Sequence, residues 1–236
     1  MKNPFNINKP SAGTAPNSHI LKEYKKTITS LSQEQIEAAI GLILGDVHLH
    51  KHKNEINYRL KFEQGDKHKL YVDHLYELFK PWVLSEPRKV TRLNKNGNIV
   101  VTWQFQTFSH DVFTELANIF IKNNKKYVPK GLIENQLTPR GLAYWFSDDG
   151  GKLDYTYQSK NKGIVFNTQG FTEENVNQIC LELSSKFNLN CSVKHNKNKP
   201  IITISSNSGE ILIDLMDPYL IPSIKSKLPG NQKIWS

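Results

Sequence analysis

Asp46 and Asp149 are the residues whose positions most strongly suggest chemistry. Each ends a run of apolar residues at helical spacing, and roughly 100 residues separate the two. A carboxylate at a helix C-terminus faces the negative end of the helix dipole, which is locally unfavourable. If the two helices pack together, the carboxylates also repel each other, and a divalent cation relieves both costs. The matched placement in a basic chain favours a metal site over two unrelated surface aspartates.

Capping residues predict the helices that position these aspartates. Ser32 and Gln35 have the spacing of a capping box, so a helix is expected between them and the first aspartate. Thr138 and Pro139 fit the N-cap and the first position of a second helix, which leads to the other aspartate. Both carboxylates are therefore expected at the C-terminal ends of short helices.

Two glycines in the first helix predict a close helix–helix contact. Gly41 and Gly45 lie four residues apart, and each costs about 1 kcal/mol relative to alanine in a helix interior. The compensation would be close approach of another helix over this face, for which the small residues of a GxxxG spacing are suited. The expected partner is the second helix, which offers Ala143. The alternative is that the glycines only accommodate a bulky neighbour.

The order of predicted elements repeats along the chain. Each half has helix, strands, helix, strands and helix, followed by Lys126 ahead of Pro129 or Lys227 ahead of Pro229. An internal repeat of this length indicates two similar halves with an α+β fold. We expect a flexible basic arm over 1–31, a first half over 32–130 and a second half over 131–236. Strands are expected over 57–64, 163–169, 190–195 and 200–206 and as a hairpin over 88–106, with further helices over 67–82, after Ser109, after Thr172 and over 209–217. The second arm of the hairpin alternates, so we expect one set of its residues inside, Ile99, Val101, Trp103 and Phe105, and the other outside, Val100, Thr102, Gln104 and Gln106.

The amino-acid composition indicates which kinds of partner the protein binds. The chain has 236 residues, a net charge of +9 and a pI near 9.4, which predicts a polyanionic partner such as nucleic acid. No apolar run approaches the roughly 20 residues that span a bilayer, so no membrane partner is expected. Two cysteines, Cys180 and Cys191, are too few for a disulfide framework and favour a reducing compartment.

Two nine-residue segments carry a family resemblance. Residues 39–47 (AIGLILGDV) and 142–150 (LAYWFSDDG) resemble the two motifs of the LAGLIDADG homing endonucleases. The first keeps four consensus residues and the second keeps another four: Gly41, Leu42, Ile43 and Asp46, then Leu142, Ala143, Asp149 and Gly150. The similarity extends from about residue 16 to 229 and is greatest to monomeric, two-motif members encoded in yeast mitochondrial introns. Tyr144 and Trp145 replace small residues of the second motif, which questions how tightly the helices pack.

The resemblance implies a fold, an activity and a location. It implies a pseudo-two-fold α+β monomer with two helix-strand-strand-helix-strand-strand-helix halves and the motif helices at a central interface. Two antiparallel sheets would form a saddle over the DNA major groove. The implied activity is divalent-metal-dependent hydrolysis of both strands of a long, asymmetric double-stranded DNA site during intron homing, in the mitochondrial matrix. The alternatives are an RNA-binding intron maturase and a catalytically inactive DNA-binding protein of the same fold.

The resemblance also implies roles for particular residues. Asp46 and Asp149 would hold the metal with the main-chain carbonyls of Gly45 and Asp148. The expected cation is Mg²⁺, with Mn²⁺ or Ca²⁺ able to substitute for binding. The active-site lysines would be Lys126 and Lys227, each of which precedes a proline. The two aspartates and these two lysines would be the catalytic residues.

The polar faces of the predicted strands are the expected DNA readers, because Arg suits guanine and Asn or Gln suits adenine. The alternative for each, and the favoured one for the lysines, is a solvated side chain or a phosphate contact. His48, His50 and His52 could suggest a metal site, but no further ligands complete it, so we interpret them as DNA-proximal or solvated. The candidates are Arg59, Lys61, Arg88, Lys89, Arg92, Gln104 and Gln106 in the first half, and Lys152, Asn167, Gln169, Lys194, Lys197, Lys199 and Thr203 in the second.

Overall fold

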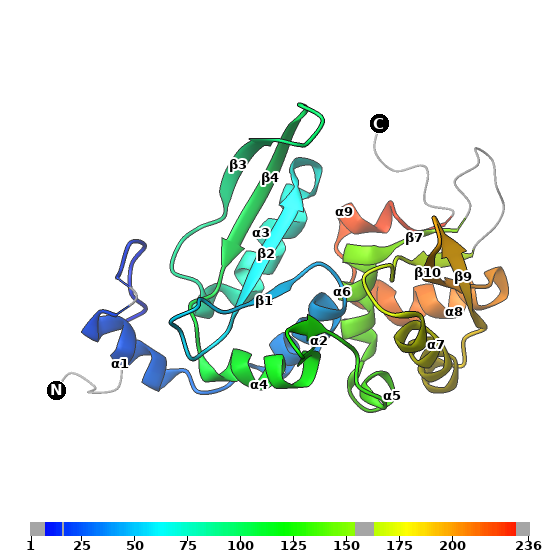
Figure 1. Ribbon diagram of the computed structural model, residues 1–236, viewed down its shortest axis with the longest axis horizontal. Coiled ribbons are helices and arrows are strands. Elements are labelled where there is room, and N and C mark those ends of the chain that lie inside the picture. The colour runs from blue at the N-terminus through cyan, green and yellow to red at the C-terminus, as the bar shows by residue number, and fades with distance from the viewer. Residues whose placement is uncertain (1–7, 16, 154–162, 230–236) are drawn as a thin grey trace. The chain divides into compact units, whose positions relative to one another are not determined.

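The computed structural model describes residues 8–15, 17–153 and 163–229 (Figure 1). Two compact units divide the chain. Unit 1 consists of Met1–Gln35 and Val47–Asn118, and unit 2 of Ile36–Asp46 and Ile119–Ser236. Residues 36–46, which carry the first motif, therefore group with the second unit. The bounds of the arm and of the two halves expected from the sequence stay a prediction.

Unit 1 is built on a four-stranded antiparallel sheet. Strands β1 (His48–His50), β2 (Arg59–Gly65), β4 (Ile99–Gln106) and β3 (Arg88–Leu93) lie in the order β1-β2-β4-β3. Helix α3 (Lys69–Phe79) packs against β2 and β4. Phe62 and Phe105 stack between them with ring centroids 4.3 Å apart. Residues on the other face of this sheet alternate with the core residues and remain polar.

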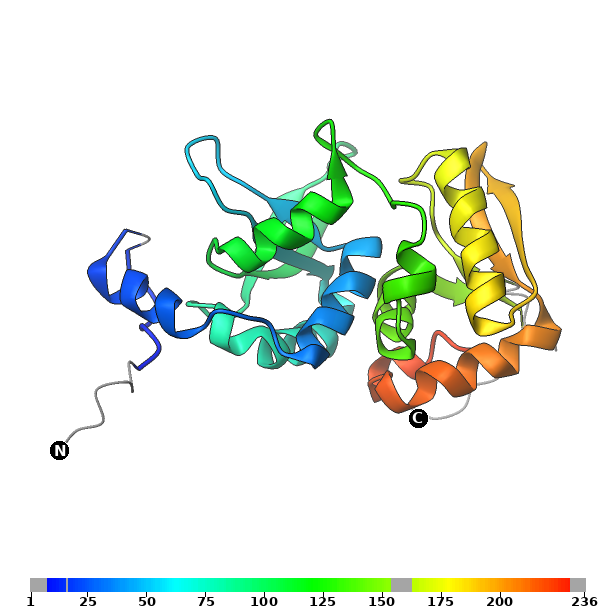
Figure 2. The same cartoon turned by 90° about the horizontal axis from the view of Figure 1, so that it is seen from below.

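Unit 2 repeats this sheet. Strands β7 (Gly150–Lys152), β8 (Ile164–Phe166), β10 (Lys199–Ile204) and β9 (Cys191–Asn196) lie in the order β7-β8-β10-β9, the same connectivity as in unit 1. Helix α7 (Glu173–Phe187) runs alongside β9 and β10 (Figure 2). The predicted α+β fold with duplicated halves is confirmed, because each sheet sits in a helix-strand-strand-helix-strand-strand-helix series.

The helices that complete the two series begin where the capping signals predict. Helix α2 (Gln33–Leu44) opens with a capping box. The backbone N–H of Gln35 donates to the Ser32 hydroxyl at 3.2 Å, and the backbone N–H of Ser32 donates to the side-chain oxygen of Gln35 at 3.0 Å. Helix α6 (Pro139–Asp149) opens with the Thr138 hydroxyl, which accepts from the Gly141 N–H at 3.2 Å. The remaining helices are α4 (Asp111–Phe120), α5 (Leu132–Gln136), α8 (Ser206–Met216) and α9 (Pro222–Lys225), with 3₁₀ turns at Asp66–His68, Lys80–Trp82 and Asp217–Tyr219.

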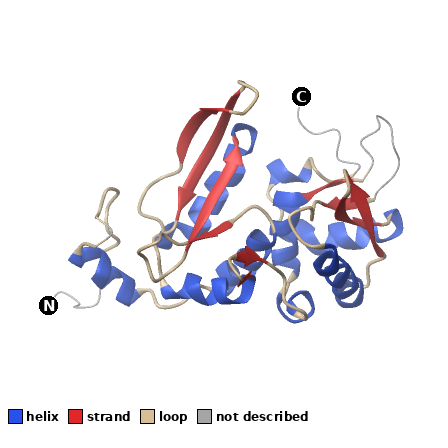
Figure 3. Cartoon of the chain, in the orientation of Figure 1, coloured by secondary structure: helices blue, strands red, loops and turns tan. Residues whose placement is uncertain are grey.

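The β3–β4 hairpin differs from expectation in its burial. The predicted alternation of faces is confirmed by the strand register. However, Ile99, expected in the core, is 71 % exposed, and Thr102, expected outside, is 6 % exposed. The tip of the hairpin, where Leu93 is also exposed, lies beyond the part of the sheet that α3 covers (Figure 3). Apolar side chains at the tip therefore have no helix to pack against.

Helix α1 (His19–Thr27) lies within the segment expected to be a flexible arm. Leu21 and Tyr24 are buried, and the Tyr24 hydroxyl donates to the Pro81 carbonyl at 3.0 Å. This part of the arm is therefore folded against unit 1, and the expectation is wrong for it. Within the described part of the chain, no helix has the length and apolar character needed to cross a bilayer.

Candidate functional site

Helices α2 and α6 contact each other inside unit 2 through glycines. A Cβ atom placed on Gly41 would lie 1.9 Å from the Gly141 carbonyl oxygen, and one on Gly141 would lie 2.8 Å from the Glu37 carbonyl oxygen. The predicted helix partner is confirmed, but the contact residue is Gly141 rather than Ala143. The two backbones are so close that neither glycine leaves room for a methyl group.

The large residues of the second motif do not disturb this contact. Trp145 is fully buried against the sheet of unit 2, with its ring 4.5 Å from that of Phe166, and Phe146 packs edge-on against the same ring. Both side chains therefore contact the core of unit 2. The close contact with α2 is made by the backbone at Gly141, while the Trp145 and Phe146 side chains pack on Phe166, so large residues in the second motif are compatible with tight helix packing.

The helix pair brings the two motif ends together. The Asp46 N–H donates to Asp148 Oδ2 at 3.1 Å, although 102 residues separate them in the chain. A Cβ atom on Gly45 would lie 2.6 Å from both Asp148 Cβ and Asp148 Oδ2, so the Asp148 side chain fills the space that a side chain at position 45 would need. The expected convergence of the two acidic ends is therefore found.

Asp149 is the half-buried carboxyl of this group, whereas Asp46 is exposed. Burial, followed by the charge of Asp46, raises the pKa of Asp149 to about 7, while Lys126 and Lys227 oppose the shift. The four charged groups that the sequence predicted therefore act on one another electrostatically. In the metal-free protein, Asp149 holds a proton over a pH range in which an ordinary aspartate is ionised.

This shift predicts how the stability of the metal-free protein depends on pH. Between pH 4 and pH 7 the unfolded chain ionises Asp149 while the folded chain keeps it protonated, so the unfolded state binds fewer protons and the free energy of unfolding falls as pH rises. We expect a loss of about 2–3 kcal/mol between pH 5 and pH 7.5 from this group. Urea titrations in EDTA measure it, and Asp149→Asn should flatten the profile. The same pH profile in both proteins would contradict the assignment.

Lys126 reaches the end of helix α2 from a tight hairpin. Strands β5 (Ile121–Lys122) and β6 (Lys125–Lys126) are joined by Asn123 and Asn124, which both have left-handed backbone angles, φ 52° and 58°. The Lys126 ammonium donates to the Gly45 carbonyl at 2.7 Å and to the Leu44 carbonyl at 3.4 Å. Burial lowers the pKa of Lys126, while the three nearby aspartates oppose this shift.

Lys227 makes the equivalent contact with helix α6. It follows α9, and its ammonium donates to the Ser147 carbonyl at 2.5 Å and to the Asp148 carbonyl at 3.3 Å. The last carbonyls of a helix have no partner within the helix and carry the negative end of its dipole, so an ammonium is favoured there. All of the predicted catalytic and metal-binding residues therefore lie at the paired ends of α2 and α6.

The oxygen atoms at the C-terminal ends of α2 and α6 are suitable ligands for a hard divalent cation. Asp46 and Asp149 supply carboxylates, and the carbonyls of Gly45 and Asp148 supply further oxygens. Among the described residues, no three His, Cys, Asp or Glu side chains are placed to hold a metal. Mg²⁺ often takes only one or two carboxylates and completes its shell with water and phosphate oxygens. The raised pKa of Asp149 reflects burial first and then repulsion from Asp46, and such a cation would counter both.

The polar face of the unit 1 sheet carries most of the predicted DNA readers of that half. The strand register places Arg59 opposite His50, Lys61 opposite Gln106 and His48, and Arg88 opposite Gln104. Opposed residues share a face of the sheet. This face borders a cavity of about 600 Å³, here called the basic groove. It is lined by five predicted readers together with His50 and His52: Arg59, Lys61, Arg88, Gln104 and Gln106.

Two predicted readers of unit 1 lie elsewhere. Lys89 is opposite Trp103, on the face that carries α3, and its ammonium lies 3.4 Å from the Asp66 carboxylate. Arg92 shares the polar face but does not line the basic groove, and it forms an ion pair with Glu63 at 2.7 Å. Lys89 is therefore turned away from the face that carries the other candidates.

The predicted readers of unit 2 divide between two faces and a turn. By register, Lys194, Lys199 and Thr203 share one face and Lys152 lies on the other, while Lys197 is in the β9–β10 turn. Thr203 is buried, and its hydroxyl is hydrogen-bonded to Ser192. The Asn167 and Gln169 side chains form a chain of contacts, in which Gln169 donates to Asn167 and Asn167 donates to the Asp149 carbonyl at 2.9 Å.

Sequence reasoning missed three charged residues of the basic groove: Lys25, Glu55 and Glu86. Lys25 lines it from helix α1, and Glu55 lines it and forms an ion pair with Arg59. The signal for Lys25 was the helical spacing of Leu21, Tyr24 and Lys25 in the segment interpreted as a flexible arm. Glu55 carried no signal, because it lies between strands and pairs with Arg59 only in the folded chain.

The duplicated α+β fold and the acidic ends of a glycine-packed helix pair define a class of protein. The model of the LAGLIDADG DNA endonuclease family matches residues 36–212. The chain therefore belongs to this family.

Individual relatives agree with this placement. The chain is 46 % identical over 231 residues to "Probable intron-encoded endonuclease 1" of Wickerhamomyces canadensis, covering 98 % of this chain and 99 % of that protein. It is similar to the solved structure of the homing endonuclease I-WcaI bound to its DNA recognition sequence, at a TM-score of 0.89 and 46 % identity, over 93 % of this chain and 96 % of that one. It is also 33 % identical over 222 residues to the cytochrome b mRNA maturase bI2 of Saccharomyces cerevisiae, covering 89 % of this chain and 50 % of the maturase.

Proposed function

We propose that this protein is a site-specific DNA endonuclease of intron homing, which hydrolyses both strands of a long, asymmetric double-stranded site with a divalent cation, Mg²⁺. The observation that carries the proposal is the meeting of two carboxylates and two lysines at the paired ends of α2 and α6. The similarity to I-WcaI, a homing endonuclease seen with its DNA recognition sequence, supports DNA as the substrate.

In this proposal, Asp46 and Asp149 hold the cation with the main-chain carbonyls of Gly45 and Asp148. A bound cation would supply activation of the attacking water, a ligand site for the phosphate and neutralisation of the charge that develops on it. Lys126 and Lys227 orient water or stabilise negative charge near the two scissile phosphates. Each ammonium lies at helix-end carbonyls and close enough to Asp149 to affect its pKa, so both lysines are at the proposed cation site.

The basic groove reads the part of the target that lies over unit 1. Arg59 and Arg88 suit guanine, while Gln104 and Gln106 suit adenine. The unit 2 sheet offers mainly lysines and a buried threonine at its candidate positions, so the two sheets present different donors. Different readers recognise different half-sites, and the target is therefore asymmetric.

This asymmetry gives a direct prediction. Once the natural site is found, palindromes built from its left half or its right half should both be cleaved more slowly than the natural site, because one sheet then meets the wrong bases. Each mismatched base pair costs about 1–3 kcal/mol in such interfaces. Initial cleavage rates on the three duplexes measure the effect. Equal rates on the natural site and on either palindrome would contradict it.

The proposed function is tested by incubating the protein with a plasmid library that contains random or intron-insertion sequences, in Mg²⁺ and in EDTA. Linear plasmid only with the metal, cut at one sequence, supports the endonuclease. RNA-selective binding without DNA cleavage supports the second candidate, an intron maturase, which the identity to the bI2 maturase favours. The presence of both carboxylates and both lysines at one site favours the nuclease.

We further propose that the protein acts as a monomer in the mitochondrial matrix. One chain carries both motif helices, so the helix pair needs no second copy. The location is supported by the yeast relatives named as maturases of cytochrome b mRNA.

A further inference from the structure

Helix α1 adds a basic residue to one end of the basic groove. We propose that α1 extends the DNA-binding face of unit 1 and that Lys25 contacts a phosphate of the target DNA there. The proposal rests on the proposed function, because it takes double-stranded DNA as the occupant of the groove. It adds to the recognition surface a helix that precedes both motifs and lies outside the residues that the family model matches.

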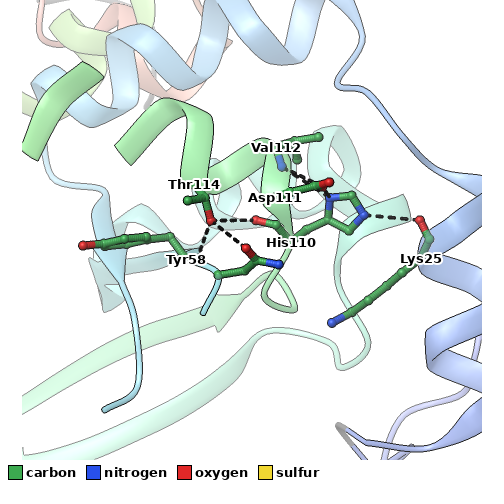
Figure 4. Close-up of polar contacts among 7 residues, drawn as sticks. Lys25, Tyr58, His110, Asp111, Val112 and Thr114 are labelled. Atoms are coloured by element: carbon green, nitrogen blue, oxygen red, sulfur yellow. Dashed lines mark hydrogen bonds and ion pairs between the residues drawn. The ribbon is translucent and has the colours of Figure 1, made fainter. Parts of the chain in front are cut away.

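The backbone of α1 is fixed in place at Lys25. His110, which is buried at the start of α4, approaches the Lys25 carbonyl through Nε2 at 3.2 Å (Figure 4). The Asp111 carboxylate lies beside the other ring nitrogen of His110. Together with buried Leu21 and Tyr24, this contact holds the helix against unit 1. The hydrogen bond uses the main chain of Lys25, so a change of its side chain leaves this contact in place.

The Lys25 side chain is held at the groove without an acidic partner of its own. Its ammonium lies 5.3 Å from the centre of the Phe108 ring and has no hydrogen bond or ion pair with another described residue. The two nearest acids are engaged elsewhere. Glu55 pairs with Arg59 and accepts from the His52 N–H, and Asp111 accepts from the Val112 N–H at 2.9 Å.

The surroundings of Lys25 favour an anion. Burial lowers the pKa of Lys25, and the Arg59 charge lowers it further, while Glu55 and Asp111 oppose the shift. Burial is the largest of these effects, and a partly desolvated cation is stabilised when an anion contacts it. Of the charged residues that line the groove, four are lysine or arginine and two are acidic. A groove lined by side chains that can recognise base edges fits DNA as its polyanion.

The chemistry of an ammonium group indicates a phosphate rather than a base as the contact. Lysine presents a compact point charge on a flexible stem, whereas the planar fork of arginine suits base edges. Phosphate contacts fix the register of a protein on the duplex without reading sequence. Lys25 therefore positions the duplex in the groove that Arg59 and Lys61 also line.

Salt-dependent DNA binding tests this role. Binding of the target duplex is measured by fluorescence anisotropy in Ca²⁺ over a series of salt concentrations, because each phosphate contact contributes about 0.9 to the slope of log affinity against log salt. Lys25→Ala and Lys25→Met are expected to weaken binding and to reduce the magnitude of the slope by about 0.9. Lys25→Arg is expected to keep the slope of the unchanged protein. The methionine variant preserves packing on Phe108, so a loss common to both variants reports charge. Thermal midpoints verify folding.

Lys26→Ala is the matched control, because Lys26 is exposed, pairs with Glu23 at 2.8 Å and does not line the groove. Its slope should equal that of the unchanged protein. Placing one uncharged methylphosphonate at successive backbone positions should find a position that weakens the unchanged protein but not Lys25→Ala. Equal slopes for Lys25→Met and the unchanged protein, or a change seen only with RNA, would overturn the inference. Failure of the unchanged protein to bind any DNA would instead overturn the proposed function.

Discussion

Asp46→Asn and Asp149→Asn are each expected to abolish double-strand cleavage in Mg²⁺ while DNA binding is largely preserved. Asparagine has almost the same shape as aspartate but lacks the charge that holds the cation, so the helix pair should keep its structure. Because the proposed mechanism makes metal, water and scissile phosphate all depend on these carboxylates, we expect a loss on the order of 10³-fold or more in the cleavage rate. Single-turnover cleavage of a labelled target duplex, with a binding assay on the same preparation, measures both quantities.

A surface aspartate provides the control for this experiment. Asp73 on α3 forms an exposed ion pair with Lys69 and lies in unit 1, whereas the residues of the proposed active site belong to unit 2. Asp73→Asn should therefore cleave at the rate of the unchanged protein. Retained cleavage by either Asp46→Asn or Asp149→Asn would remove that carboxylate from the proposed site. Loss of binding together with cleavage would indicate that the substitution had damaged the fold.

Gly41→Ala is expected to destabilise unit 2 strongly. A methyl group at this position would lie 1.9 Å from the Gly141 carbonyl oxygen, and both partners are helix backbone, so relief requires the two helices to move apart. The higher helix propensity of alanine offsets only about 1 kcal/mol. We expect the free energy of unfolding to fall by at least about 3 kcal/mol.

Gly170→Ala is the matched control, because no atom lies within 4 Å of a Cβ placed on Gly170, which is also in unit 2. Urea denaturation followed by circular dichroism compares the two variants with the unchanged protein, and hydrogen exchange at the amides of α2 and α6 locates the effect. Midpoints that agree for Gly41→Ala and Gly170→Ala would contradict the close packing of the helices.

Local chemistry allowed much of the fold to be predicted. The capping residues Ser32, Gln35 and Thr138 act through hydrogen bonds within one turn, so their sequence spacing was sufficient to place two helix starts. The period of two along β4 likewise predicted which side chains share a face. Burial was predicted less well, because it depends on how far α3 extends along the hairpin.

The sequence was sufficient to predict which residues form the candidate site, but not which atoms contact each other there. Asp46 and Asp149 were indicated by their repeated positions, but the meeting of Gly41 with Gly141 depends on how two helices cross, which no local pattern encodes. The hydrogen bonds of Lys126 and Lys227 to helix carbonyls also join segments about 80 residues apart. Helix α1 was missed because proline, serine and asparagine before it dominated the composition of its segment.

The fit of Asp148 over Gly45 has a consequence for evolution and for engineering. Across homologues, a larger residue at position 45 should occur only with a smaller one at position 148, so the two columns of an alignment should covary. A chimaera that takes its first motif from one family member and its second from another inherits this constraint. Designers who exchange halves to create new specificities should therefore transfer positions 45 and 148 as a single unit.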